Sequence, residues 1–181
     1  MADIINSIKD IEKTFWNVTS QILGIDTNLA ENQGKVRRSW QTTGAPSWKI
    51  TDDVTFIQVL PVDDEFAKQR DIGYSDHDSI TAKRSINYSR VFSIGWTCYG
   101  PNSFDNIETI RNGIFLPVFT NQIKAINMCL VTDVGMPQRV PELFNGQWWE
   151  RCDFSARYNE AVERSNTVPY LDRVGIITQK G

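Results

Sequence analysis

The residues that could carry chemistry are few and scattered. His77 is the only histidine in the chain, and it lies between Asp76 and Asp78. Three adjacent ligands on a loop make a poor site for a divalent metal, and no nucleophile lies near His77 in the sequence to form a catalytic pair. The chain also lacks the glycine-rich phosphate-binding motifs and the C-x-x-C pair. We therefore expect no metal, no cofactor and no enzymatic activity.

Composition limits the class of protein further. Hydrophobic residues make up 40% of the 181 residues and the net charge is −3. The chain can therefore build one core, and it has no general attraction for nucleic acid or anionic membranes. No apolar run approaches the roughly 18 residues of a membrane-spanning helix. Three widely spaced cysteines favour a reduced, cytosolic setting over a disulfide framework. We expect a single domain over residues 1–181.

The apolar periodicities predict an α+β fold. An apolar stripe with spacings of three and four residues predicts a helix from Ile4 to Ile22, with Asp3 as its N-cap and Gly24 as its stop. Pro117 separates two further helices. Helices and strands do not alternate regularly, so we expect a mainly antiparallel sheet. The N-terminal helix and the central helix pair should pack on one face of it, and long hairpin or loop extensions should leave it. The central helices are predicted at 103–115 and 117–126, the strands at 36–40, 54–60, 89–99, 128–132, 148–163 and 167–178, and a turn at 42–46.

The sequence also predicts where the apolar-face aromatic residues and an acidic segment lie. Aromatic residues on apolar faces are predicted to lie in the core, namely Trp16, Phe92, Trp96, Phe104 and Phe154. Residues 63–83 are predicted to form an acidic loop or the tip of an extended hairpin, because they contain few core anchors. Between residues 63 and 78, six acids stand against two bases, and these acids are Asp63, Asp64, Glu65, Asp71, Asp76 and Asp78.

A proline-rich segment leads directly into the longest predicted strand. Pro137 and Pro141 favour extended backbone, and Asn145-Gly146 favours a tight turn. From Trp148 onward, even positions are mostly apolar and odd positions mostly charged, which is the pattern of a half-buried strand. Trp149 falls on the polar face, where an exposed tryptophan is a common interface anchor. The residues alone leave two interpretations open, an ordinary surface loop and an interface.

Three stretches resemble a known family. They are residues 35–53, the string YGPNSFDN at 99–106 and the string PQRVPELFNGQWWER at 137–151. Together they are similar to the neck or tail terminator family of tailed bacteriophages, in the order that this family has them and over most of the chain from Lys35 onward. The N-terminal helix and the acidic segment are less diagnostic.

The resemblance implies a structural virion protein, assembled in the host cytoplasm. Such proteins form a ring, expected to contain six copies, that caps the tail tube, ends tail polymerisation and joins the tail to the head-side connector. The implied partners are further copies of the chain, the tail tube protein and the head-side neck protein, with a sheath as a further candidate. DNA would pass through the lumen without specific binding, and no membrane is involved.

We assign two surfaces to this assembly. One side of the ring interface is predicted at the polar, odd-numbered face of the long strand and the segment before it, with Pro137, Arg139, Pro141, Trp148, Trp149 and Arg151. The acidic residues of the 63–83 segment are predicted to line the lumen or to meet the tube. An adaptor or head-completion protein, which often has twelve copies, and a carbohydrate-binding module that uses exposed tryptophans remain alternatives.

Overall fold

The elements of the fold follow one another as helix, strands, two helices and strands. The computed structural model describes residues 3–41 and 47–170, so the predicted turn at 42–46 lies outside the described residues. The helices are α1 (Ile8–Ile22), a 3-10 turn (Ala30–Asn32), α2 (Glu65–Lys68), α3 (Ser103–Gly113) and α4 (Pro117–Lys124). The strands are β1 (Val36–Arg38), β2 (Val54–Pro61), β3 (Asp71–Asp76), β4 (Thr81–Tyr99), β5 (Met128–Leu130), β6 (Gln138–Arg139), β7 (Glu142–Phe144), β8 (Gln147–Trp149) and β9 (Arg151–Pro169).

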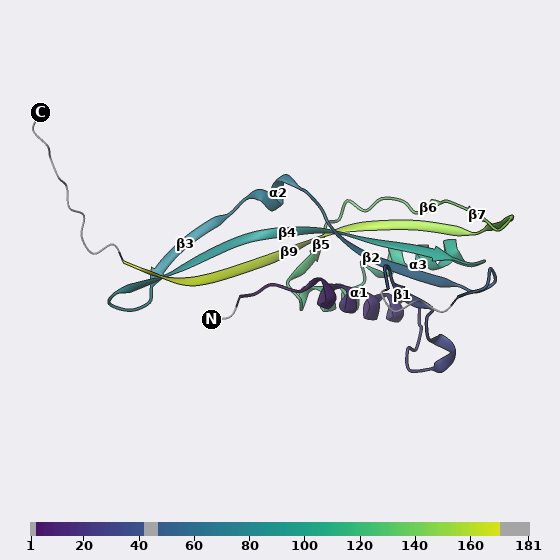
Figure 1. Ribbon diagram of the computed structural model, residues 1–181, viewed down its shortest axis with the longest axis horizontal. Helices are drawn as coiled ribbons and strands as arrows, with labels where there is room; N and C mark the ends of the chain where they lie inside the picture. The colour runs from purple at the N-terminus through teal and green to yellow at the C-terminus, as the bar shows by residue number, and fades with distance from the viewer. Residues whose placement is uncertain (1–2, 42–46, 171–181) are drawn as a thin grey trace, which may run out of the picture.

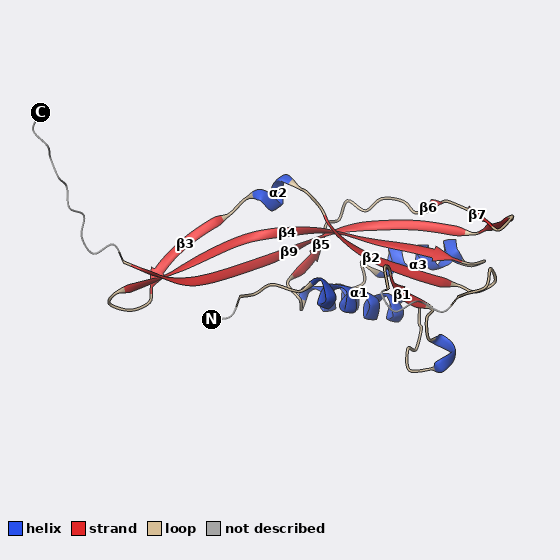
Figure 2. Cartoon of the chain, viewed as in Figure 1, coloured by secondary structure: helices blue, strands red, loops and turns tan. Residues whose placement is uncertain are grey.

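Seven strands form one mixed sheet, and β7 and β8 form a separate hairpin. The main path is β1-β2-β4-β9-β5, with β3 added to β4 and β6 added to β9. Every pair in this sheet is antiparallel except β1 with β2. Figure 2 shows that the strands dominate the molecule and that the helices lie mainly to one side of them. The predicted α+β fold with a mainly antiparallel sheet is therefore confirmed.

The pairing of β4 with β9 forms the axis of the molecule. Both strands have 19 residues, and they pair without interruption from Thr81↔Pro169 to Tyr99↔Arg151. The alternation predicted from the sequence is present, because the even positions of β9 from Cys152 to Val162 are all buried. Directly opposite residues share a face of a sheet. The apolar side chains of both strands therefore form one continuous surface for the helices.

α1 covers this surface with one apolar stripe. Phe15 meets Tyr158 edge to face, with ring centroids 4.7 Å apart. The indole N–H of Trp96 donates to Thr19 Oγ1 of the helix at 2.8 Å, which satisfies the one polar atom of a fully buried tryptophan. α3 and α4 lie in the same layer, and Ile107 and Ile123 join the same core. The predicted helix layer on one face is thus confirmed (Figure 1).

Two details of the helix layer differ from the prediction. α1 begins after Ser7, whose hydroxyl accepts a hydrogen bond from Asp10 N, and not after Asp3. The reason is that Ile4 forms a backbone bridge with Glu163 on the edge of β9, which keeps this segment extended. The predicted stop at Gly24 is confirmed by its φ of +65°. Phe104 is 43% exposed at the start of α3, so its predicted core position is wrong.

A buried ion pair ties the N-terminal segment to the middle of β4 and β9. Glu160 is fully buried, and its carboxylate accepts from Arg90 Nε at 2.6 Å and from the backbone N of Asn6 at 2.8 Å. Arg90 also donates to the carbonyl of Asn6, and the Asn6 amide donates to Glu160 and to Ile126 O. Both carboxylate oxygens of the buried Glu160 therefore have partners, which a buried charge requires.

Beyond this ion pair the sheet continues as an arm that α1, α3 and α4 do not cover, and only the short α2 lies at its root. The arm consists of β3, residues 81–89 of β4 and residues 161–169 of β9 (Figure 1). The hairpin-tip interpretation of residues 63–83 is therefore right and the loop interpretation is wrong, because β3 pairs with β4 along its whole length. β4 begins at Thr81, eight residues before the predicted start. Thr167 to Pro169 belong to β9 itself and pair with β4, so a separate last strand starting at Thr167 is wrong. Residues 171–178 of that predicted strand lie outside the described residues.

The ion pair gives a direct stability test. Arg90→Ala leaves the buried Glu160 carboxylate without its countercharge, and we expect it to lower the free energy of unfolding by about 3–5 kcal/mol. Urea denaturation followed by tryptophan fluorescence measures this loss. Arg38→Ala serves as the control, because Arg38 pairs with Glu12 at 3.6 Å on the surface and such pairs contribute about 0–1 kcal/mol. Equal effects of the two substitutions would contradict the assigned role of Glu160.

Candidate functional site

The proline segment ends in a small hairpin at the far end of the molecule from the arm. β7 and β8 pair through Glu142↔Trp149 and Phe144↔Gln147. Asn145 and Gly146 both have positive φ, +49° and +76°, as the predicted Asn-Gly turn requires. Pro141 separates β6 from β7. Figure 1 shows β6 running along β9 and β7 projecting past the end of the sheet.

An aromatic cluster holds this hairpin on the end of the sheet. Trp149 lies edge-on to Trp48 and to Phe144, with ring centroids 6.2 and 6.0 Å away. Trp48 also packs against Tyr99 at 5.7 Å and Phe56 at 5.2 Å. Trp48, Tyr99, Phe144 and Trp149 line an apolar pocket of about 350 Å³ that opens to solvent. Such a pocket fits an apolar or aromatic side chain of a partner.

A polar frame surrounds the cluster. Arg151 binds Asp153 at 2.8 Å and Glu142 at 3.2 Å, and these contacts raise the pKa of the Arg151 guanidinium, with the Asp153 hydrogen bond as the main cause. Tyr99 donates from its hydroxyl to Glu142 at 2.9 Å. Burial, followed by this hydrogen bond, raises the pKa of Tyr99 to about 12. The phenol therefore stays protonated near neutral pH and keeps β7 fixed to the end of β4.

The residues predicted to form the ring interface differ in how exposed they are. Trp148 is the outermost, with 66% of its surface exposed, whereas Trp149 is half-buried in the aromatic cluster. The continuous alternation predicted from Trp148 fails there because Glu150 separates β8 from β9, so the long strand begins at Arg151. Arg139 pairs with Glu150 at 2.9 Å. Pro137 is half-buried and Pro141 is exposed.

We call the exposed apolar side chains of this end the hairpin surface, defined as Val140, Leu143, Phe144 and Trp148. All four are exposed and lie within nine residues of the chain. Sequence reasoning missed Leu143 and Phe144 as surface residues, and it also missed the anchoring roles of Tyr99 and Glu142. The apolar residues flanking Asn145-Gly146 were a usable signal for the first pair. No local pattern indicates the contact between Tyr99 and Glu142, which are 43 positions apart.

The six acids of the predicted acidic segment are not a uniform negative strip. Asp64 caps α2 through a hydrogen bond from Phe66 N at 2.9 Å and lies 3.7 Å from Arg157. Lys68 pairs with Glu65 and Asp63. Asp78 accepts from the hydroxyl and backbone N of Thr81 and from Ile80 N, and these bonds lower the pKa of its carboxyl, with the Thr81 hydroxyl as the main cause.

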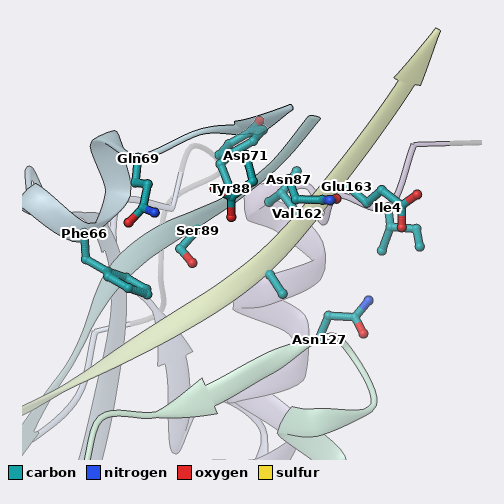
Figure 3. Close-up of a pocket in the computed structure, with 11 residues that line it drawn as sticks. Ile4, Phe66, Gln69, Asp71, Asn87, Tyr88, Ser89, Asn127, Val162 and Glu163 are labelled. Carbon is teal, nitrogen blue, oxygen red and sulfur yellow. The ribbon is translucent and has the colours of Figure 1, made fainter. Parts of the chain in front are cut away.

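The remaining two acids lie on β3. Asp76 accepts from the Tyr170 hydroxyl at 2.7 Å. Asp71 lines a pocket of about 390 Å³ at the root of the arm, between α2 and the paired strands β4 and β9 (Figure 3). The ring of Phe66 points toward this pocket from α2, near Ser89, and Asn87 and Glu163 lie on its strand side. The arrangement is a partly apolar hollow whose two carboxylates, Asp71 and Glu163, come from different strands.

His77 and the three cysteines are not among the residues that line this pocket. His77 lies in the turn at the tip of the arm, where its backbone N donates to Thr81 O. Within residues 3–41 and 47–170, no three side chains of the metal-binding types are grouped so that they could hold an ion. Cys98 and Cys152 are buried opposite each other across β4 and β9, and Cys129 is exposed. No helix in this part of the chain is long and apolar enough to cross a membrane.

Comparison with known proteins gives one family. A family model described as phage neck terminator protein matches residues 9–181. The match includes the arm, the sheet, the helix layer and the hairpin described above. None of the curated proteins that were compared matches the chain.

The different burial of the two tryptophans predicts different effects on folding. Trp149→Ala removes the ring that packs on Trp48 and Phe144, and we expect it to destabilise the subunit by about 2–4 kcal/mol. Trp148→Ala removes an exposed ring, and its effect should stay within about 0.5 kcal/mol. Thermal unfolding followed by circular dichroism, with the urea midpoint as a second readout, checks both values. A larger loss for Trp148→Ala than for Trp149→Ala would contradict this arrangement.

Proposed function

The chain belongs to the phage neck terminator protein family, and on that premise we propose that its copies form a ring that caps the tail tube. The ring ends tail polymerisation and joins the tail to the head-side connector. Six copies is the expected number. The family match over residues 9–181 is the observation that carries the proposal. The partners are the tail tube protein, the head-side neck protein and, where a sheath exists, the sheath.

The hairpin surface supports a role in subunit contact. Three of its four members, Leu143, Phe144 and Trp148, lie on the projecting β7–β8 hairpin. Hot spots of protein interfaces are enriched in tryptophan and surround themselves with weaker contacts that exclude water. Arg139, Trp149 and Arg151 lie beside this surface and are held by contacts within the subunit. They form the rigid support of the interface, with Pro137 and Pro141 restricting the backbone before it.

The acidic residues of the arm suit a surface past which DNA moves. Carboxylates and DNA phosphates repel each other, so a surface that carries Asp63 and Glu65 would not retain DNA. We propose that the root of the arm, where these two acids lie, faces the lumen or the end of the tube. Five of the six acids also make contacts within the chain. Asp63 and Glu65 share Lys68, Asp64 caps α2, Asp76 accepts from the Tyr170 hydroxyl and Asp78 accepts from Thr81.

Assembly state is the direct test of the ring. Multi-angle light scattering and negative-stain microscopy of the purified protein, alone and mixed with tail tubes, should show a six-fold ring in solution or on tube ends. Twelve copies would favour the adaptor or head-completion alternative. A protein that stays monomeric and never decorates tube ends would refute the proposal.

The hairpin surface gives a matched pair of variants for the same assay. Trp148→Ala should weaken subunit association by about 2 kcal/mol or more, since a central interface tryptophan typically contributes this much. That is a rise of about thirtyfold or more in the concentration at half-assembly. Val118→Ala alters an exposed apolar residue on α4 instead and should leave assembly unchanged. An unchanged midpoint for Trp148→Ala would remove the hairpin surface from the interface.

A further inference from the structure

The two faces of the arm differ in chemistry. Cross-strand partners share a face, so Ile72, Ile86 and Arg164 lie side by side, as do Tyr74, Arg84 and Asn166. These are even positions of β4 and β9, the same face that carries Phe92 and Tyr158 in the core. The helix-bearing face of the sheet thus continues into the arm beyond the end of the helices, and it keeps apolar residues there.

The opposite face of the arm is made mostly of polar and charged side chains. On β4 it presents Thr81, Lys83, Ser85, Asn87 and Ser89 at the odd positions. Such a face is stable in water. The arm also exposes large apolar side chains, because Ile72 is 52% exposed, Tyr74 66% and Ile80, at the tip, 72%. We call Ile72, Tyr74 and Ile80 the arm surface. Single exposed apolar residues need no explanation, but three on one short single-layer ribbon mark a contact site.

The edges of the arm differ as well. On the β9 side, Ile4 pairs with Glu163, Asp3 accepts from Ser165 N at 3.3 Å, and Pro169 has no N–H to offer. On the β3 side, the odd residues pair with β4, so the peptide groups of Ile72, Tyr74 and Asp76 are directed outward. An open edge with apolar side chains invites another chain. Among residues 3–41 and 47–170, the β9 edge of the arm is therefore partly covered and the β3 edge is open.

We propose that the arm surface of one copy seats on the hairpin surface of the next copy. The two surfaces lie at opposite ends of the long axis of the molecule (Figure 1), and they differ from each other. Contact between two different patches is heterologous, and it produces a closed ring when the rotation closes. This inference rests on the proposed ring, and it names the two surfaces that form each contact.

The charges and the exposed areas of the two surfaces are consistent with contact between neighbouring copies. Arg84, beside Tyr74, has no acidic partner among the described residues of its own chain. Glu142 and Glu150 border the hairpin surface; each pairs with an arginine of its own subunit but stays about half exposed, so a further cation can reach it. Tyr74, Phe144 and Trp148 are each more than half exposed, so burying each removes on the order of 100 Å² from water. With the aliphatic residues of both surfaces this approaches half of a standard interface of about 1,600 Å².

Cross-linking between two cysteine variants tests the contact. Both variants carry Cys129→Ser to remove the exposed native thiol. One also carries Tyr74→Cys and the other Gln147→Cys, an exposed position of β8 beside Trp148 that leaves the tryptophan in place. A short bismaleimide added to their mixture should give a cross-linked dimer that neither variant gives alone. Ser75→Cys is the matched control for Tyr74→Cys, because Ser75 is the next residue of β3, is also exposed, and lies on the polar face.

The outcomes separate the contact from the ring itself. The proposal is supported if the mixture gives the cross-linked dimer and its yield falls at least fivefold when Ser75→Cys replaces Tyr74→Cys. Cross-links in the Tyr74→Cys variant alone would show arm-to-arm pairing and overturn it. Light scattering on the same samples reports the ring: rings without the mixed cross-link would overturn the arm contact and leave the proposed function standing. Absence of any oligomer, free or on tail tubes, would overturn both.

Assembly of untagged protein gives a second, independent readout. The double variant Ile72→Ser, Tyr74→Ser should raise the concentration at half-assembly at least tenfold, whereas Ser75→Ala should change it less than twofold. The circular dichroism spectrum and urea midpoint of the double variant should match those of the parent protein, since both side chains are exposed. A folded double variant that assembles like the parent would refute the contact.

Discussion

The uninterrupted pairing of β4 with β9 is the constraint on which the rest of the structure depends. Nineteen consecutive residue pairs fix the register, so every even position of both strands falls on the helix side. The core lies where α1, α3 and α4 cover that side, the arm is what remains beyond them, and the β7–β8 hairpin is attached where β9 begins. A slip of one residue would turn Phe154 and Tyr158 to the solvent and Ser155 and Arg157 to the core. The strong apolar alternation of β9 makes such a slip costly.

The fold was largely predictable from local patterns. The stripe of α1, the proline between α3 and α4, and the alternation of β9 all depend on neighbours in the sequence, and all three predictions hold. The misplaced boundaries have nonlocal causes. Asp3 had the chemistry of an N-cap, but the bridge between Ile4 and Glu163 keeps that segment extended. Residues 81–88 lack a strong apolar pattern because they lie in a single layer, and their strand state depends on pairing with β3 and β9.

The sequence predicted which segment holds the candidate site, but not how its side chains are arranged. Composition and resemblance both directed attention to residues 137–151. Trp148 is exposed and Trp149 half-buried, the reverse of the prediction, because Glu150 lies between β8 and β9 and interrupts the alternation. The cluster around Trp149 depends on Trp48 and Tyr99, which come from two other parts of the chain. The acidic segment likewise looked uniform in sequence. In the structure, Asp64 caps α2, Asp76 accepts a hydrogen bond from Tyr170 and Asp78 stabilises the turn at Thr81.

The continuity of β4 and β9 between body and arm also determines how the subunit bears force. Tension applied to the arm along its length loads the hydrogen bonds between the two strands in shear, so many bonds must break together. Tension applied sideways at the tip would peel the strands apart one pair at a time and meet far less resistance. The buried Arg90–Glu160 pair lies at the junction of arm and body. The arm should therefore resist tension along its length and yield to force applied across it.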